Sequence, residues 1–197
     1  MTETLSVYVP YINNPYNDIF NIKSLNIANI EAYIDGACSG NNSKELQRFG
    51  AYAFVCKIQL MDSTFISWSC VEMSSDMNPT NNTMELMAAI LLLRKIKLVY
   101  NKKINIYSDS EYVINGINKY IDEWNRNNWR KSNGELVKNK KLWETLLTLK
   151  FEHGDTVTFT HIKGHDGNEY NEIADKLCND AIKKYKSTIH KNEESEY

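Results

Sequence analysis

Residues 33–40 place one carboxylate, Asp35, near the end of an apolar strand and follow it with small residues. Apolar residues Ile30, Ala32 and Ile34 alternate with polar ones up to the acid, as in a strand with two unlike faces. The residues after it leave room for a polymer backbone to approach the carboxylate: Gly36, Ala37, Ser39 and Gly40. A strand ending in a polar turn is the alternative for an Asp-Gly pair on its own.

Three further acids, Glu85, Asp109 and Asp175, lie in comparable contexts. Glu85 falls in the first turn of a predicted helix, Asp109 follows a short apolar run, and Asp175 lies within the last helical segment. Taken singly, Glu85 could complement a helix dipole and Asp109 could cap the helix after it. Four acids at or inside structural elements favour a shared site instead, because a partly buried carboxylate without partners is costly.

Composition limits where such a site could operate. The chain has 197 residues, 42% of them hydrophobic, which predicts one main domain, and its net charge of −2 means that nucleic-acid binding would depend on local basic patches. The four cysteines, which form no C-x-x-C pair, predict reduced thiols: Cys38, Cys56, Cys70 and Cys178. Residues 1–22 contain no Lys or Arg and no long apolar run occurs. We therefore expect no signal or transit peptide, no membrane association, and a cytoplasmic or nuclear location.

The residue periodicity predicts an α/β fold. Residues 1–28 show no single period and are interpreted as an extension, residues 29–185 as the folded domain, and residues 186–197 as a charged, disordered tail. Short polar connections predict antiparallel pairing of three strands at residues 30–38, 49–60 and 63–73. The next segments alternate helix and strand, which favours parallel pairing: helices at 80–100, 108–117, 140–151 and 168–185, and strands at 104–107 and 156–162.

Five segments, in chain order, resemble type 1 ribonuclease H. They are YIDGACSGN at residues 33–41, TNNTMELMAA at 80–89, YSDSEYV at 107–113, KGHDG at 163–167 and NEIAD at 171–175. The resemblance covers about residues 30–184. It implies the ribonuclease H-like fold, a five-stranded mixed sheet with three antiparallel and then two parallel strands, flanked by helices. It also implies an endonuclease that hydrolyses the RNA strand of RNA–DNA hybrids, leaving 5′-phosphate and 3′-hydroxyl ends.

The resemblance implies a role for each acid. Asp35 would bridge two metal ions, Asp109 would help hold the ion that activates water, and Glu85 and Asp175 would complete the coordination, while His165 would assist proton movement or product departure. Carboxylates gathered this closely repel one another, and divalent cations remove that penalty. All-oxygen ligands suit two Mg²⁺ ions, with Mn²⁺ as a substitute, and the absence of a Cys and His cluster argues against zinc.

The same resemblance implies a surface for the hybrid, which is the expected partner of a monomeric enzyme. Residues matching positions near the ribose hydroxyls are Cys38, Ser39, Asn41, Asn81 and Asn82, and those matching a DNA phosphate pocket are Thr80 and Asn139. Those matching aromatic contacts to deoxyribose are Tyr112 and Tyr120, and those matching a basic protrusion are Trp129, Arg130, Lys131 and Ser132. Such contacts to the backbone predict little sequence preference.

Two alternatives stay open at this point. One is a transposase or junction nuclease that shares the fold. The other is a hybrid-binding module without activity, although such a module would gain stability by losing crowded charge. The chain also departs from the family pattern at Asp166, next to His165, and in residues 42–48.

Overall fold

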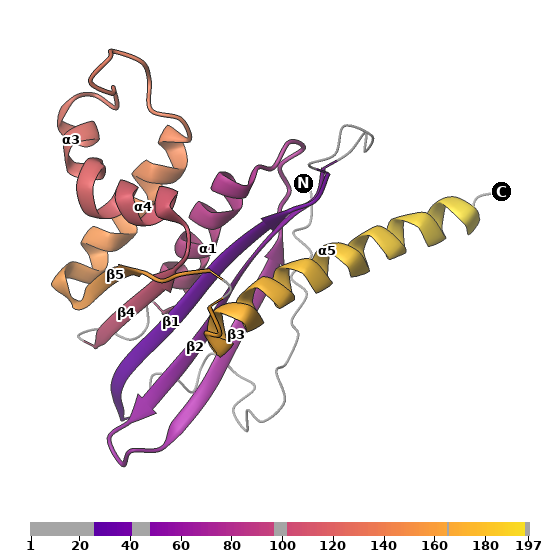
Figure 1. The fold of residues 1–197 in the computed structure, drawn as a ribbon, viewed down its shortest axis with the longest axis horizontal. Coiled ribbons are helices and arrows are strands. Elements are labelled where there is room, and N and C mark those ends of the chain that lie inside the picture. The colour runs from indigo at the N-terminus through magenta and orange to yellow at the C-terminus, as the bar shows by residue number, and fades with distance from the viewer. Residues whose placement is uncertain (1–25, 41–47, 97–101, 165, 196–197) are drawn as a thin grey trace.

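The computed structural model describes residues 26–40, 48–96, 102–164 and 166–195, and within them a five-stranded mixed sheet with the order β3-β2-β1-β4-β5. β1 (Ile27–Cys38), β2 (Gly50–Leu60) and β3 (Phe65–Met73) pair antiparallel. β4 (Lys103–Ser108) pairs parallel with both β1 and β5 (Val157–His161). The predicted α/β class, the strand order and the change from antiparallel to parallel pairing are therefore confirmed (Figure 1).

Helices cover both faces of the sheet (Figure 1). One face packs against α1 (Asn81–Lys95) and, behind it, α4 (Lys140–His153). Between β4 and α4 the chain forms α2 (Glu111–Asn115), a π-helical turn η3 (Gly116–Tyr120) and α3 (Ile121–Arg126). The other face is crossed by α5 (Glu169–Ser195), and a short 3₁₀ turn, η4 (Gly154–Thr156), leads into β5.

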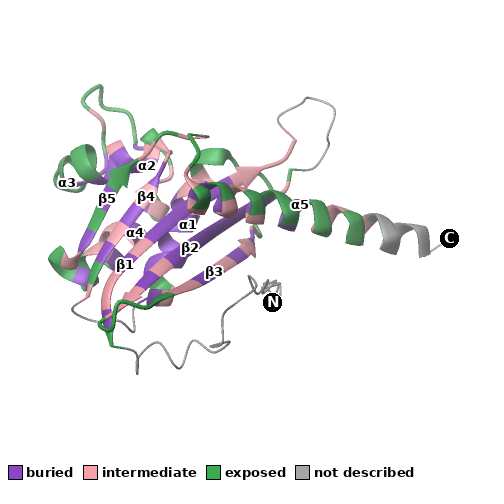
Figure 2. Cartoon of the chain, turned by 60° about the horizontal axis from the view of Figure 1, so that its bottom comes forward, coloured by how far each residue is buried: buried purple, intermediate pink, exposed green. Residues whose placement is uncertain are grey.

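Alternating strand residues divide the core into two clusters. The even-numbered residues of β1, such as Ile30 and Ile34, face α1, which is buried nearly all round between the sheet and α4. On the opposite face Ala51, Ala53 and Val71 pack against the apolar stripe of α5. The outer side of α5 is exposed, as the green segments in Figure 2 show.

The predicted helix at 108–117 is wrong in its extent. α2 ends at Asn115 and continues through η3 into α3, so the helical path runs to Arg126. Gly116 explains the local packing, because a Cβ there would lie 2.1 Å from the Trp143 ring. The π-helical turn η3 therefore packs against the large buried side chain of Trp143. The residue periodicity does not reveal this contact.

The predicted end of the last helix is also wrong. α5 continues to Ser195, through most of the segment expected to be a disordered tail from residue 186. The segment lacks Gly and Pro and is rich in Lys and Glu, so nothing in it stops a helix that packing has already started. At the other end, β1 begins at Ile27, within the predicted extension 1–28, and residues 1–25 lie outside the described part. No helix in the described ranges is both long and apolar enough to cross a membrane.

Candidate active site

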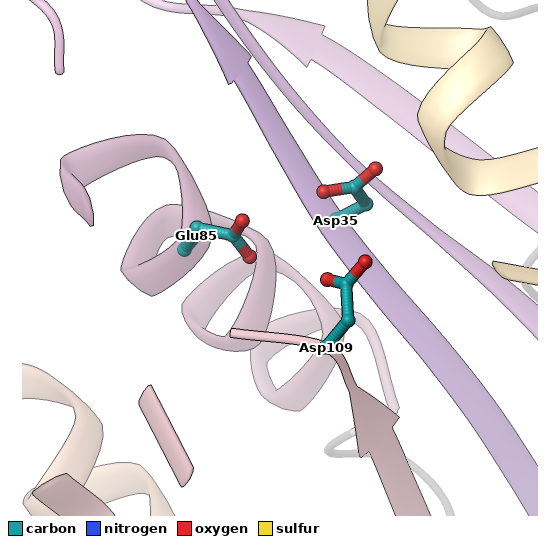
Figure 3. Close-up of side chains that lie close together, drawn as sticks. All are labelled: Asp35, Glu85 and Asp109. Atoms are coloured by element: carbon teal, nitrogen blue, oxygen red, sulfur yellow. The ribbon is translucent and has the colours of Figure 1, made fainter. Parts of the chain in front are cut away.

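Three acids meet at one end of the sheet: Asp35 on β1, Glu85 on α1 and Asp109 directly after β4. A carboxylate oxygen from each lies within 4.8 Å of those of the other two (Figure 3). Tyr33 of β1 pairs with Tyr107 of β4, so Asp35 and Asp109, each two residues later, end up at the same level. The parallel pairing of β1 and β4 thus joins residues that are far apart in the sequence.

A close approach of α1 to β1 brings Glu85 to the two aspartates. A Cβ at Gly36 would lie 2.2 Å from the Met84 carbonyl carbon and 2.4 Å from the Glu85 backbone nitrogen. Gly36 is therefore needed because no side chain fits between strand and helix, whereas the sequence led us to expect that it leaves room for a polymer backbone.

Neither simpler explanation for these acids holds. α1 begins at Asn81 with Thr80 as its N-cap, so Glu85 lies beyond the first turn, contrary to the prediction, and does not complement the helix end. α2 is capped by Ser110, whose side chain accepts a hydrogen bond from the Val113 N–H, and not by Asp109. Neither Glu85 nor Asp109 therefore serves to stabilise a helix end.

Burial and mutual repulsion dominate the electrostatics. Burial, and after it the negative charges of Asp35, Asp109 and Asp175, together raise the pKa of Glu85 to about 9. Glu85 Oε2 is fully enclosed, and no described group donates a hydrogen bond to it. Asp35 is only 8% exposed, and its Oδ1 accepts a hydrogen bond of 2.7 Å from the Gly36 N–H. A set of buried and half-buried oxygen donors with excess negative charge fits a divalent cation.

The fourth acid, Asp175, borders the same pocket from α5 but lies outside the close group of three. Its Oδ1 accepts a 2.8 Å hydrogen bond from Asn179 Nδ2. The pocket is open and polar, and it holds about 230 Å³ between the ends of β1 and β4, α1 and the start of α5. The structure thus brings all four predicted acids to one pocket.

Asn171 is a site residue that the sequence analysis gave no role. It is 4% exposed, and its Nδ2 donates a 3.3 Å hydrogen bond to Asp109 Oδ2. Its Oδ1 is buried, and no described group donates to it. The signal was present in the sequence, because Asn171 precedes Asp175 by one helical turn and so shares its face of α5.

Comparison with known proteins now places the chain. The family model described as RNase H matches residues 28–183. The chain belongs to the ribonuclease H family. Ribonuclease H from Francisella philomiragia is 39% identical over 154 residues, covering 78% of this chain and 91% of that protein. Ribonuclease H from Caldanaerobacter subterraneus is 38% identical over 157 residues, covering 79% of this chain and 92% of that protein.

Solved structures support the same fold at lower identity. LC9-RNase H1, a type 1 RNase H with the type 2 active-site motif, superposes with a TM-score of 0.66 at 21% identity, over 78% of this chain and 72% of that one. The solution structure of the PFV RNase H domain gives 0.61 at 20% identity, over 77% and 92%. The predicted family is confirmed, and with it ribonuclease H activity on RNA–DNA hybrids and a metal-dependent endonuclease class.

The residues expected near the ribose hydroxyls lie in different surroundings in the structure. Asn81 borders the pocket and Asn82 is exposed beside it, and neither caps α1. Cys38 also lines the pocket, but its Sγ donates to the Pro79 carbonyl at 3.1 Å, and burial raises its pKa. Ser39 Oγ accepts from the Phe49 N–H, which ties it to the entry of β2. Asn41 and His165 lie outside the described residues.

Of the residues expected to bind the DNA strand at a phosphate or a sugar, Asn139 and Tyr112 contact each other. Asn139 Nδ2 and Trp143 Nε1 donate to the Tyr112 hydroxyl at 3.1 and 3.0 Å. Thr80 uses its side chain to accept from the Thr83 N–H as helix cap. Tyr120 is 46% exposed and stacks on Trp124 with ring centroids 5.6 Å apart. Of these side chains, Thr80 and Tyr120 are exposed, and Tyr112 and Asn139 are half-buried.

The prediction that Trp129 contacts the hybrid is not supported by its position. Trp129 is 5% exposed and belongs to the main core cluster, so it anchors the loop after α3. The exposed charge comes from Arg130, whose Nη1 donates to the Gly134 carbonyl at 2.7 Å, and from Lys131, which pairs with Glu135 at 3.3 Å. Ser132 is exposed on the same loop. The basic protrusion therefore has a buried aromatic base and a charged tip.

Proposed function

We propose that this ribonuclease H hydrolyses the RNA strand of RNA–DNA hybrids with two Mg²⁺ ions held by Asp35, Glu85, Asp109 and Asp175. The observation that carries this proposal is the meeting of three carboxylates within 4.8 Å, one with an enclosed oxygen that lacks a donor among the described residues. Oxygen-only donors suit Mg²⁺, and Mn²⁺ would substitute for it. When bound, such ions supply an activated water and stabilise the leaving 3′-oxygen, which yields 5′-phosphate and 3′-hydroxyl ends.

The fold must hold the four carboxylates close together although they repel one another. Gly36 lets α1 lie directly against β1, which fixes the backbone of Glu85 close to Asp35. Asn171 holds one oxygen of Asp109 through its amide. These contacts orient the donors before a cation or a substrate arrives, and such preorganisation lowers the cost of binding.

The hybrid would lie across the pocket and reach the basic protrusion. Asn81 and Asn82 present side-chain amides beside the acids, where they could hydrogen-bond 2′-hydroxyls in a shallow minor groove. Arg130 and Lys131 would contact the DNA backbone, with Tyr120 packing against a sugar. Contacts of this kind carry no base information, so we expect little sequence preference.

A cleavage assay on a labelled RNA–DNA hybrid in Mg²⁺, with double-stranded RNA and DNA beside it, tests the proposal. We expect cleavage of the RNA strand of the hybrid alone, and its loss in Asp35→Asn and in Asp109→Asn. Asp180→Asn, which changes an exposed acid of α5, is the matched control and should keep full activity.

Circular dichroism must show that the inactive variants are folded. Full activity in either active-site variant would refute the metal assignment, and binding of the hybrid without cleavage by the unchanged chain would favour a module that only binds. The catalytic role of His165, the monomeric state and the cytoplasmic or nuclear location remain predictions from the sequence.

A further inference from the structure

One edge of the sheet is long, and the sequence of its strand has none of the features that commonly discourage pairing. β3 forms this edge and spans nine residues, Phe65–Met73 (Figure 1). Natural edge strands are commonly short or carry Lys or Pro, which discourages the addition of another strand. β3 contains neither, and its one charged side chain, Glu72, is turned to Tyr52 and Lys95 at 3.2 and 3.5 Å. The opposite edge, β5, has five residues and is mostly exposed and polar.

The pattern of backbone hydrogen bonds between β2 and β3 shows which amides of β3 point away from the sheet. The Leu60 N–H donates to the Thr64 carbonyl, and the Ser74 N–H donates to the Gly50 carbonyl, both at 2.8 Å. Between these ends the register is unbroken, so the even-numbered residues of β3 bond to β2. The odd-numbered residues direct their N–H and C=O groups away from the sheet, and no described backbone group pairs with them: Phe65, Ser67, Ser69, Val71 and Met73.

The described chain begins at Asn26, beside one end of this edge. The Asn26 carbonyl accepts a 2.8 Å hydrogen bond from the Met61 N–H, in the turn that joins β2 to β3. Within residues 1–25, residues 4–9 read Thr-Leu-Ser-Val-Tyr-Val, with Leu5, Val7 and Val9 alternating with polar or aromatic residues, and Pro10 ends the run. β-branched and aromatic residues in period-2 alternation, closed by a proline, are typical of a strand.

We propose that residues 4–9 pair with the outer edge of β3 as a sixth, antiparallel strand. The sixteen residues of 10–25 can span roughly 50 Å when extended, against roughly 30 Å for the nine residues of β3, so the tether is long enough. The antiparallel direction brings Val9 to the Phe65 end of β3, which is where Asn26 lies. A tethered segment also has an effective concentration in the millimolar range, so it pairs in preference to a second copy at micromolar concentration.

The test is residue-resolved amide hydrogen exchange on the full chain, with two prolines introduced in the segment. Adjacent N–H groups of a strand point to opposite sides, so the pair Ser6→Pro and Val7→Pro removes one donor to β3 in either register. We expect Ser67, Ser69 and Val71 to be protected in the unchanged chain and to exchange about tenfold faster or more in this variant. Trp68 and Cys70, which bond to β2, should keep their protection.

A control variant with Asn13→Pro and Asn17→Pro places two prolines in the connecting stretch and should leave exchange unchanged. Fast exchange of the outward amides in the unchanged chain, or equal protection in the Ser6→Pro and Val7→Pro variant, would overturn the proposal. Protection that grows with protein concentration, together with a dimer mass in light scattering, would also overturn it, because a second copy would then cover the edge. Cleavage plays no part in the readout, so this proposal can fail without the nuclease assignment failing.

Discussion

Replacing Glu85 by Gln should stabilise the metal-free protein at neutral pH and abolish cleavage of the hybrid. Burial and three neighbouring carboxylates raise the pKa of Glu85 to about 9. Between its ordinary value of 4.5 and about 9, the folded chain holds a proton that the unfolded chain has released. The free energy of unfolding therefore falls as the pH rises through this window, and below about 4.5 this penalty is absent.

The magnitude follows from the same shift. Each pKa unit corresponds to about 1.4 kcal/mol, and neutral pH lies about 2.5 units above the ordinary value, so the penalty reaches about 3 kcal/mol at pH 7. Gln has nearly the shape of the protonated side chain and carries no charge. The variant should thus exceed the unchanged chain by up to about 3 kcal/mol at pH 7 and match it near pH 4.5.

Urea unfolding in EDTA at several pH values from 4.5 to 8 measures this difference. Glu172→Gln, a change of an exposed acid that lines the same pocket, is the control and should alter the free energy by less than about 0.5 kcal/mol. Adding Mg²⁺ should stabilise the unchanged chain and close part of the gap, because ligand binding to the folded state is lost in the variant. A variant that is less stable than the unchanged chain at pH 7, or a gap that does not shrink toward pH 4.5, would refute the electrostatic argument.

Three further changes test the supporting structure. Gly36→Ala should cost about 1–3 kcal/mol in urea unfolding and slow cleavage, because a Cβ there collides with α1; unchanged stability would contradict the close packing. Trp129→Ala should cost about 3 kcal/mol, as expected for a buried aromatic anchor, and a purely ligand-binding role would instead leave stability intact. Arg130→Ala with Lys131→Ala should weaken hybrid binding and reduce the slope of log affinity against log salt by about 2 at most, with the folded state unchanged in circular dichroism.

Strand positions could be predicted closely because each strand has one buried and one more polar face. The alternation of Ile30 and Ile34 with polar neighbours in β1 is such a pattern, and the long helix α1 was equally clear from its apolar spacing. The register of β1 and β4, in which Tyr33 pairs with Tyr107, places Asp35 and Asp109 side by side at the same end of the sheet. The family motifs then supplied the identity of the fourth acid on α5.

The missed features depend on contacts between segments that are distant in the sequence. The π-helical turn at Gly116 reflects the ring of Trp143 on another helix, and the burial of Trp129 reflects the core beneath the protrusion. A basic run with an embedded tryptophan has the same sequence whether the ring faces solvent or the core. The length of α5 was missed for another reason, since lack of apolar residues predicts lack of packing and does not predict where a helix ends.

The geometry at Gly36 connects the stability of the fold with its chemistry. Strand and helix touch there without a side chain between them, so the backbone of Glu85 stays close to Asp35. Burial and the repulsion between the carboxylates then raise the pKa of Glu85 and favour its protonated form. A divalent cation offers the alternative, since it replaces that proton and satisfies the enclosed oxygen at once. Affinity for the cation therefore depends on how firmly α1 and β1 are packed, as well as on the number of carboxylates. A substitution that loosens this contact should weaken metal binding even when all four acids are retained.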